Sequence, residues 1–211
     1  MTSIQNADQV AILKDLAAVI VANKAWLSDI DGKIGDGDHG LNMKRGALAI
    51  QAKLADWQGK TFNETLKAMG LTCLSTIGGS SGPVFGTLLV TLAKELPPSP
   101  AAADLARALR LGIEALTKLG KAEVGQKTLL DVLDPLQRLL AEPSEDAVVG
   151  AAGLVGRARQ CAFDAADATA QMEAIKGRAS FLGDRALGHV DPGSRSMALI
   201  VASICDHLSA R

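Results

Sequence analysis

The chain has 211 residues, of which 48% are hydrophobic and 21% are charged, and its net charge is −1. This length and composition allow one globular domain with a full core, so we expect a single domain over residues 1–211. The near-neutral charge and the 3% aromatic content, without any tyrosine, argue against nucleic acid and anionic membrane surfaces as partners.

The first half of the chain has apolar residues at helical spacing, interrupted by glycine-rich stretches. Thr61 and Glu64 have the spacing of a capping box. The strongly apolar segment 84–96 fits a buried strand or a helix by periodicity alone, and its length and setting favour a helix. We therefore predict helices over residues 8–30, 41–54, 62–77 and 84–96.

The second half continues the helical pattern. Pro135 lies inside one predicted helix, where proline bends the backbone. Asp191 and Pro192 have the order of a helix N-cap followed by proline at the first helical position. Residues 177–193 form a long glycine-containing connection. We predict helices over residues 105–120, 129–139, 143–175 and 191–208, and we assign the chain to the all-α class because no strand alternation is visible.

Other signals place the chain in a reducing cytoplasm. The three cysteines are far apart, which favours small apolar core residues over a zinc site or a disulfide framework. The most apolar stretch, 84–93, is too short to span a bilayer. The first residues lack the pattern of a signal peptide.

An acidic, glycine-rich loop is the most informative stretch of the sequence. Asp31, Asp36 and Asp38 lie within eight residues of one another, and glycines separate them. Crowded carboxylates repel one another unless a hard cation lies between them, so the spacing predicts a Mg²⁺ or Ca²⁺ site. A solvated acidic turn is the alternative. The helix predicted behind His39 would also offer its N-terminus to a phosphate.

Two further segments add weaker signals. Residues 79–82 form a Gly-Ser-Ser-Gly loop that could wrap a phosphate or serve only as a turn. Arg178 opens the long connection and could contact a phosphate or make a surface salt bridge. Asp191 could be a ligand contact or only a helix cap. His39 could be a metal ligand, an orienting hydrogen-bonding group or a phosphate contact.

Four sequence blocks, taken together, are specific. They are residues 34–43 (IGDGDHGLNM), 78–83 (GGSSGP), 177–180 (GRAS) and 188–193 (GHVDPG). In this order and spacing they resemble the ADP-binding subunit, or L subunit, of bacterial dihydroxyacetone kinase. The resemblance covers essentially the whole chain.

The resemblance implies an eight-helix antiparallel barrel with the nucleotide at one end. It implies ADP or ATP and two Mg²⁺ ions as cofactors, with Asp31, Asp36 and Asp38 holding the metal. The catalytic candidates that it implies are Arg178 and His39. The implied nucleotide contacts are His39, Gly40, Leu41, Asn42, Ser80, Ser81, Gly120, Leu129, Arg178, Asp191, Pro192 and Gly193.

The resemblance also implies partners. The Asp-His-Gly-Leu-Asn-Met form looks like the kind of enzyme that keeps ADP bound and receives phosphoryl groups from a phosphohistidine subunit of the phosphotransferase system. The ATP-using kind typically has cysteine and threonine where this chain has His39 and 41–42. A second subunit would bind dihydroxyacetone. The oligomeric state stays open, a homodimer included. The alternatives are an ATP-dependent kinase for another small ketose and a non-catalytic Mg-ADP sensor.

Overall fold

The computed structural model describes residues 6–142 and 150–210, and within these ranges the chain forms helices and no strand. The all-α prediction is therefore confirmed. Its α-helices are α1 (Asn6–Ala22), α2 (Lys24–Ile34), α3 (His39–Lys53), α4 (Phe62–Thr76), α5 (Ser81–Glu95), α6 (Ala102–Gly120), α7 (Leu130–Ala141), α8 (Gly150–Ala168) and α9 (Pro192–Ser209). The short 3₁₀ helices are η1 (Ala55–Trp57), η2 (Thr169–Gln171) and η3 (Arg178–Ala186).

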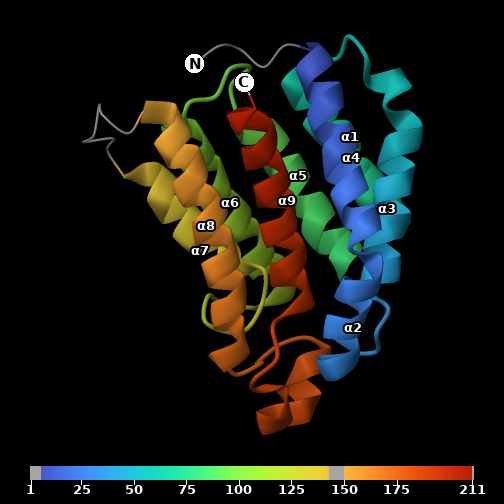
Figure 1. Cartoon of the computed structure of the whole chain (residues 1–211), viewed down its shortest axis with the longest axis vertical. Helices are drawn as coiled ribbons and strands as arrows, with labels where there is room; N and C mark the ends of the chain where they lie inside the picture. The colour runs from blue at the N-terminus through green and yellow to red at the C-terminus, as the bar shows by residue number, and fades with distance from the viewer. Residues whose placement is uncertain (1–5, 143–149, 211) are drawn as a thin grey trace.

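Eight of these helices contact one another in a closed order. Helix α1 contacts α3, each helix from α3 onward contacts the next, and α9 returns to α1. Helix α2 stands outside this ring and contacts α1, α3, α9 and η3 at one end of the molecule (Figure 1). The start of α1 and the end of α9 lie at the opposite end (Figure 1). The barrel geometry that the resemblance implies stays a prediction beyond this order of contacts.

Small residues let the helices approach closely. Gly70 of α4 and Gly86 of α5 face each other, and a Cβ on Gly86 would lie 2.9 Å from the carbonyl oxygen of Gly70. Ala162, Ala166 and Ala198 are completely buried in the main core. Glycine and alanine at these contacts allow close packing of the helix backbones, and the loops lie at the two ends of the helices.

Several helix boundaries follow their sequence signals. The Thr61–Glu64 capping box is present at the start of α4, and the Asp191 side chain accepts a hydrogen bond from the Ser194 amide at the start of α9. Pro135 lies inside α7, as predicted. These ends are fixed locally, because each side chain satisfies an N–H group that the helix itself leaves free.

Two helix predictions were wrong in their limits. The single helix predicted over residues 8–30 is two helices that meet at Asn23, whose side-chain amide donates to the Val19 carbonyl at 2.8 Å. Such side-chain bonds compete with helical geometry. The helix predicted over 143–175 ends at Ala168 and passes into η2. Its predicted start lies outside the described residues.

No helix within the described part of the chain is long and apolar enough to cross a membrane. The three cysteines are free, and Cys73 and Cys205 are buried, as their apolar interpretation predicts. Burial raises the pKa of the Cys73 thiol to about 12, which makes it a poor nucleophile.

Candidate functional site

The three acidic residues of the first loop come together at the end of α2. Asp31 is buried in the last turn of the helix, whereas Asp36 and Asp38 are exposed on the loop that follows. One carboxylate oxygen from each lies within 4.8 Å of the other two. Gly37 has φ 77°, a left-handed conformation that glycine adopts without strain. All-oxygen donors at this separation fit a hard divalent cation such as Mg²⁺.

Asp31 is also fixed by the start of α3. The His39 amide donates to Asp31 Oδ2 at 3.1 Å, and this bond joins the two sides of the acidic loop. The Gly40 position brings the helices into close contact, because a Cβ there would lie 2.7 Å from the Ser28 amide nitrogen and closer still to the Lys24 carbonyl oxygen. Gly40 therefore has a structural reason to be glycine, apart from any ligand contact.

Arg178 lies on the segment that we call the flap, residues 172–188. Its guanidinium forms an ion pair with Asp36, and its side chain is 65% exposed. The structure thus places the predicted phosphate-binding cation directly against a predicted metal ligand. A cavity of about 490 Å³ opens beside this pair, lined by Ile34, Gly35, Asp36, Arg178, Phe181 and Leu182.

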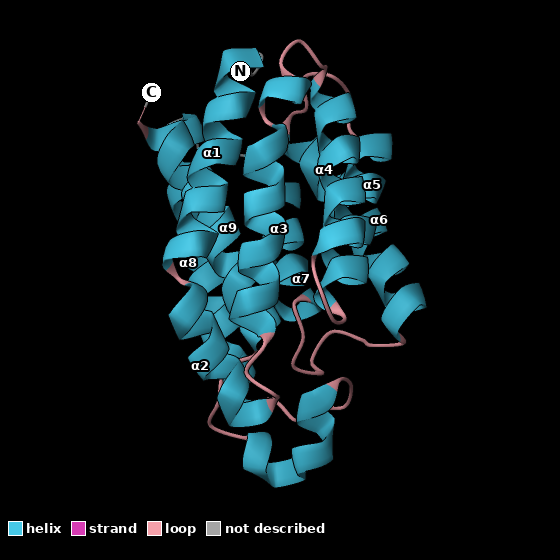
Figure 2. Ribbon diagram, turned by 90° about the vertical axis from the view of Figure 1, so that its right-hand side faces the viewer, coloured by secondary structure: helices cyan, strands magenta, loops and turns pink. Residues whose placement is uncertain are grey.

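The flap rests on the end of α2 through a small apolar cluster. Ile34 is buried together with Ala174 and Ala186 of the flap, and Ala179 and Leu182 pack against them. Figure 2 shows the flap at the same end of the molecule as α2. The acidic loop and the Arg178 segment, far apart in sequence, are therefore held side by side.

Four helix N-termini are joined at this end by side-chain hydrogen bonds. His39 at the start of α3 bonds Ser196 of α9 through Nε2 at 2.7 Å and Ser81 of α5 through Nδ1 at 3.2 Å. Ser194 of α9 donates to the carbonyl of Thr128, which precedes α7, at 2.8 Å. Helix N-termini present free N–H groups, so the arrangement favours an anionic ligand.

The environment of His39 favours one of its three predicted roles. Burial lowers the pKa of the imidazole, although Asp31, Asp38 and the Pro192 carbonyl act in the opposite direction. Both ring nitrogens already take part in hydrogen bonds to hydroxyl groups. A buried ring with both nitrogens engaged is suited to orienting Ser81 and Ser196 rather than to binding a metal.

The remaining residues of the first two blocks divide between packing and exposure. Asn42 is buried beneath the Gly78 turn, where a Cβ would lie 2.5 Å from the Asn42 side-chain oxygen. Leu41 is about half exposed, and Ser80 is exposed at the start of α5. Leu41 and Ser80 are accessible to a ligand, while Asn42 supports the turn.

The residues predicted for the far side of the nucleotide differ in their burial and neighbours. Leu129 is buried before α7, and a Cβ on Gly193 would lie 3.9 Å from its Cβ. Gly120 is exposed at the end of α6, and a Cβ there would have no neighbour within 4 Å. Burial raises the pKa of Asp191 to about 6, and this carboxyl caps α9, which is the alternative considered for it in the sequence.

Sequence reasoning missed several polar groups that hold the site together. Thr128 and Asp131 have the spacing of a helix cap, and the Thr128 amide donates to Asp131 Oδ2 at 2.6 Å. That spacing could have been found. Lys127, Thr169 and Ser196 have no local pattern that marks them, because their partners are distant in sequence.

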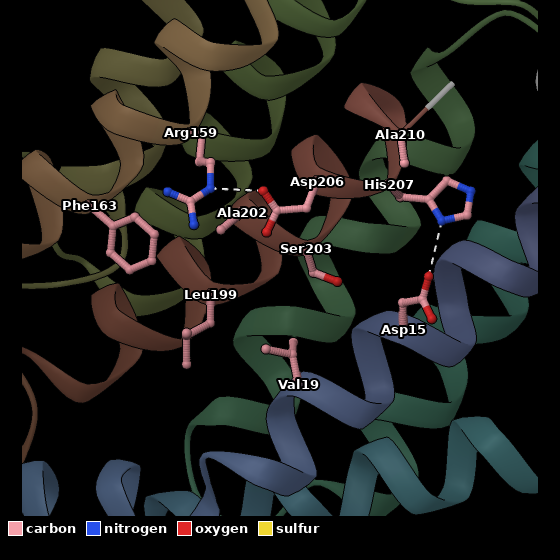
Figure 3. A pocket seen from close by; sticks show the side chains of 10 residues that line it. All are labelled: Asp15, Val19, Arg159, Phe163, Leu199, Ala202, Ser203, Asp206, His207 and Ala210. Atoms are coloured by element: carbon pink, nitrogen blue, oxygen red, sulfur yellow. Dashed lines mark hydrogen bonds and ion pairs between the residues drawn. The ribbon is translucent and has the colours of Figure 1, made fainter.

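A second cavity, of about 420 Å³, lies among α1, α8 and α9 (Figure 3). Arg159 and Asp206 form an ion pair on one side, and His207 contacts Asp15 at 3.0 Å on the other. Apolar side chains also line it, among them Val19, Phe163 and Leu199. None of the predicted site residues lines this cavity, and its volume is close to that of the cavity beside Arg178, so volume alone does not distinguish the two.

Comparison with known proteins identifies relatives of the whole chain. The DAK2 domain matches residues 33–206. The ADP-binding subunit of a PEP-dependent dihydroxyacetone kinase from Listeria innocua is 36% identical over 190 residues, covering 89% of each chain. The corresponding subunit from Escherichia coli is 39% identical over 178 residues, covering 83% of this chain and 84% of its own.

Solved structures show the same fold. The dihydroxyacetone kinase of C. freundii, in complex with AMP-PNP and Mg²⁺, superimposes with a TM-score of 0.75 at 22% identity. The match covers 96% of this chain and 34% of that one, so this chain spans about a third of the larger protein.

Proposed function

The chain belongs to the DAK2 domain family, and from this premise we propose that it is the ADP-binding subunit of a dihydroxyacetone kinase that depends on the phosphotransferase system. The proposal includes a cytoplasmic location and two partner subunits. One partner would donate phosphoryl groups from a phosphohistidine, and the other would bind dihydroxyacetone. A homodimer is compatible with this role.

One observation carries the proposal. The cluster of Asp31, Asp36 and Asp38 lies at the same end of the molecule as four joined helix N-termini and Arg178. Carboxylates attract divalent cations, whereas N–H groups and a guanidinium attract phosphate oxygens. A metal–diphosphate ligand combines both charges, and it is the ligand class that such a mixed site suits best.

Each part of the site has a proposed task. Asp31, Asp36 and Asp38 would hold two Mg²⁺ ions, which offset charge on the phosphate oxygens when bound. Ser80 and Ser81 would contact the phosphates. The remaining nucleotide contacts would come from His39, Gly40, Leu41, Asn42, Gly120, Leu129, Arg178, Asp191, Pro192 and Gly193.

The proposed reaction moves one phosphoryl group twice. It passes from the partner's phosphohistidine to bound ADP, and then from the resulting ATP to a hydroxyl of dihydroxyacetone, whose proton leaves to a base on the sugar-binding subunit. Arg178 stabilises negative charge on the group in transit, and His39 fixes the hydroxyls of Ser81 and Ser196. The chain itself needs no nucleophile.

The test is a reconstitution with both partner subunits. We expect dihydroxyacetone phosphate to form when phosphoenolpyruvate and the phosphotransferase proteins are supplied, and not when ATP is the sole donor. ADP should be found in the purified chain by native mass spectrometry. Turnover with ATP alone would instead identify an ATP-dependent ketose kinase. Tight ADP binding without any sugar phosphate would identify a sensor.

A further inference from the structure

Lys127 is a buried lysine whose ammonium group is fully hydrogen-bonded. It lies in the loop between α6 and α7, residues 121–129, and is only 2% exposed. Its Nζ donates to the carbonyl oxygens of Thr169 at 2.7 Å, Met172 at 3.3 Å and Ala170 at 3.5 Å. An ammonium has three donors, and each finds an acceptor here. Lysine is rarely buried without such compensation.

The backbone of Lys127 gives a second, independent observation. Its φ is 60°, a left-handed conformation that costs a non-glycine residue free energy. Glycine would adopt this conformation more easily, yet the position carries a long side chain that reaches into the interior. The surrounding structure therefore holds Lys127 in place through its side-chain contacts.

The acceptors of Lys127 form the base of the flap. The Gly188 amide donates to the Ala170 carbonyl at 2.8 Å, and the Asp191 amide donates to Thr169 Oγ1 at 3.0 Å. The two ends of the flap thus meet at η2, and the flap is a loop closed at its base. The Lys127 ammonium, which comes from the α6–α7 loop, donates hydrogen bonds to the backbone carbonyls at this base.

The α6–α7 loop is in turn tied to the start of α9. The Thr128 carbonyl accepts the Ser194 hydroxyl at 2.8 Å, and Leu129 lies beside Gly193. Burial lowers the pKa of Lys127, and the nearby Asp191 carboxylate opposes that change. One ammonium group therefore connects two loops that both carry predicted nucleotide contacts, Leu129 and Arg178.

We propose that Lys127 is a positioning residue that fastens the α6–α7 loop to the base of the flap, so that Leu129 and Arg178 keep a fixed position relative to each other. The part of this proposal that concerns nucleotide binding rests on the proposed function. The part that concerns the flap does not, because it is a property of the ligand-free chain.

The experiment measures amide hydrogen exchange and Mg-ADP affinity in the full chain. Lys127→Met keeps the unbranched side chain as far as its fourth atom and removes the ammonium donors. The matched control is Asn63→Ala, because the Asn63 amide also donates to two carbonyls, those of Ala93 and Leu96, at the opposite end of the molecule. Both variants lose a side-chain donor that joins two segments.

In Lys127→Met we expect the amides of Gly188 and Asp191 to exchange at least tenfold faster without nucleotide, together with the amides of 121–129. Mg-ADP should bind at least tenfold more weakly by calorimetry. Asn63→Ala should lower the melting temperature and leave flap exchange and Mg-ADP affinity unchanged. Flap exchange in Lys127→Met that matches the Asn63→Ala control would overturn the proposal.

Two contingencies are covered by the same measurements. If Lys127→Met does not fold, Lys127→Gln, which keeps a smaller donor group without charge, is expected to show the same tenfold loss of flap protection, and unchanged protection would refute the role of the ammonium. If the wild-type chain does not bind Mg-ADP, the proposed function fails, while the exchange comparison still decides the role of Lys127.

Discussion

Adding one methyl group at Gly40 tests whether the contact between α2 and α3 sets the geometry of the acidic cluster. The new Cβ would lie 2.7 Å from the Ser28 amide nitrogen and closer still to the Lys24 carbonyl oxygen. Both distances are shorter than Cβ atoms tolerate in folded proteins. Both neighbours are backbone atoms and cannot rotate away. The start of α3 must therefore move from α2, and His39 would move from Asp31 with it.

The expected cost combines two opposing effects. Overpacking of this kind typically costs about 1–3 kcal/mol. Replacing glycine by alanine within a helix stabilises the folded state by about 0.5–1 kcal/mol. We expect Gly40→Ala to lower the free energy of unfolding by roughly 1–2 kcal/mol, and thus the melting temperature by about 2–8 °C for a chain of this size.

Calorimetry gives the second readout. Because Asp31 and Asp38 lie on the two sides of the displaced contact, Mg-ADP should bind at least about tenfold more weakly, equivalent to about 1.4 kcal/mol. Gly156→Ala is the matched control, because Gly156 is exposed in α8 and its Cβ would meet no atom within 4 Å. The control should be slightly stabilised and should bind normally. A Gly40→Ala protein as stable as this control would refute the reasoning from backbone overlap.

Three further predictions concern charge and ligand. Asp36→Asn or Asp38→Asn should abolish Mg-ADP binding in calorimetry and leave the helical circular dichroism unchanged; ADP affinity equal to wild type would reject the metal site. Because burial raises its pKa to about 6, Asp191 binds more protons in the native state than in the unfolded state between pH 4 and 6. Lowering the pH from 7 to 4 should therefore raise the free energy of unfolding of the wild type relative to Asp191→Asn by up to about 3 kcal/mol, measured by denaturant unfolding. A pH-independent difference between the two proteins would contradict the burial of this charge. Mg-ADP at 100 times its dissociation constant should add about 2.7 kcal/mol to the stability of the chain, measured as a melting shift that EDTA reverses; an equal shift after EDTA would rule out the metal.

The sequence predicted the elements whose signals are local. The side chains of Thr61 and Glu64 each accept a hydrogen bond from the other's backbone N–H group, and the Asp191 side chain accepts one from the Ser194 amide. The spacing of apolar residues is likewise a property of one helix at a time. Such features can be recognised without knowing which segments pack against them. This is why the all-α class and most helix limits were predictable.

The two helix limits that were predicted wrongly depend on hydrogen bonds that the spacing of apolar residues does not reveal. Apolar periodicity continues across Asn23 and does not mark the break between α1 and α2, where the Asn23 backbone has a ψ of 9° and its side chain bonds the Val19 carbonyl. The alanine-rich run continues past Ala168, but Thr169 Oγ1 bonds the Ala166 carbonyl and accepts from Asp191, which lies 22 residues later. A helix end that depends on a distant segment cannot be found from neighbouring residues.

The convergence of the site depends on the direction in which each helix runs. Helices α3, α5, α7 and α9 begin at the candidate functional end, while their neighbours α4, α6 and α8 run toward it. Macrodipoles of opposite direction cancel at a distance, and their effect is confined to the first turn. Attraction of a phosphate must therefore come from the individual N–H groups of the first turns and from Arg178. Under the proposed function, nucleotide affinity would therefore depend on the hydrogen bonds that orient those turns, such as the one between His39 and Ser196, which are 157 residues apart in the sequence.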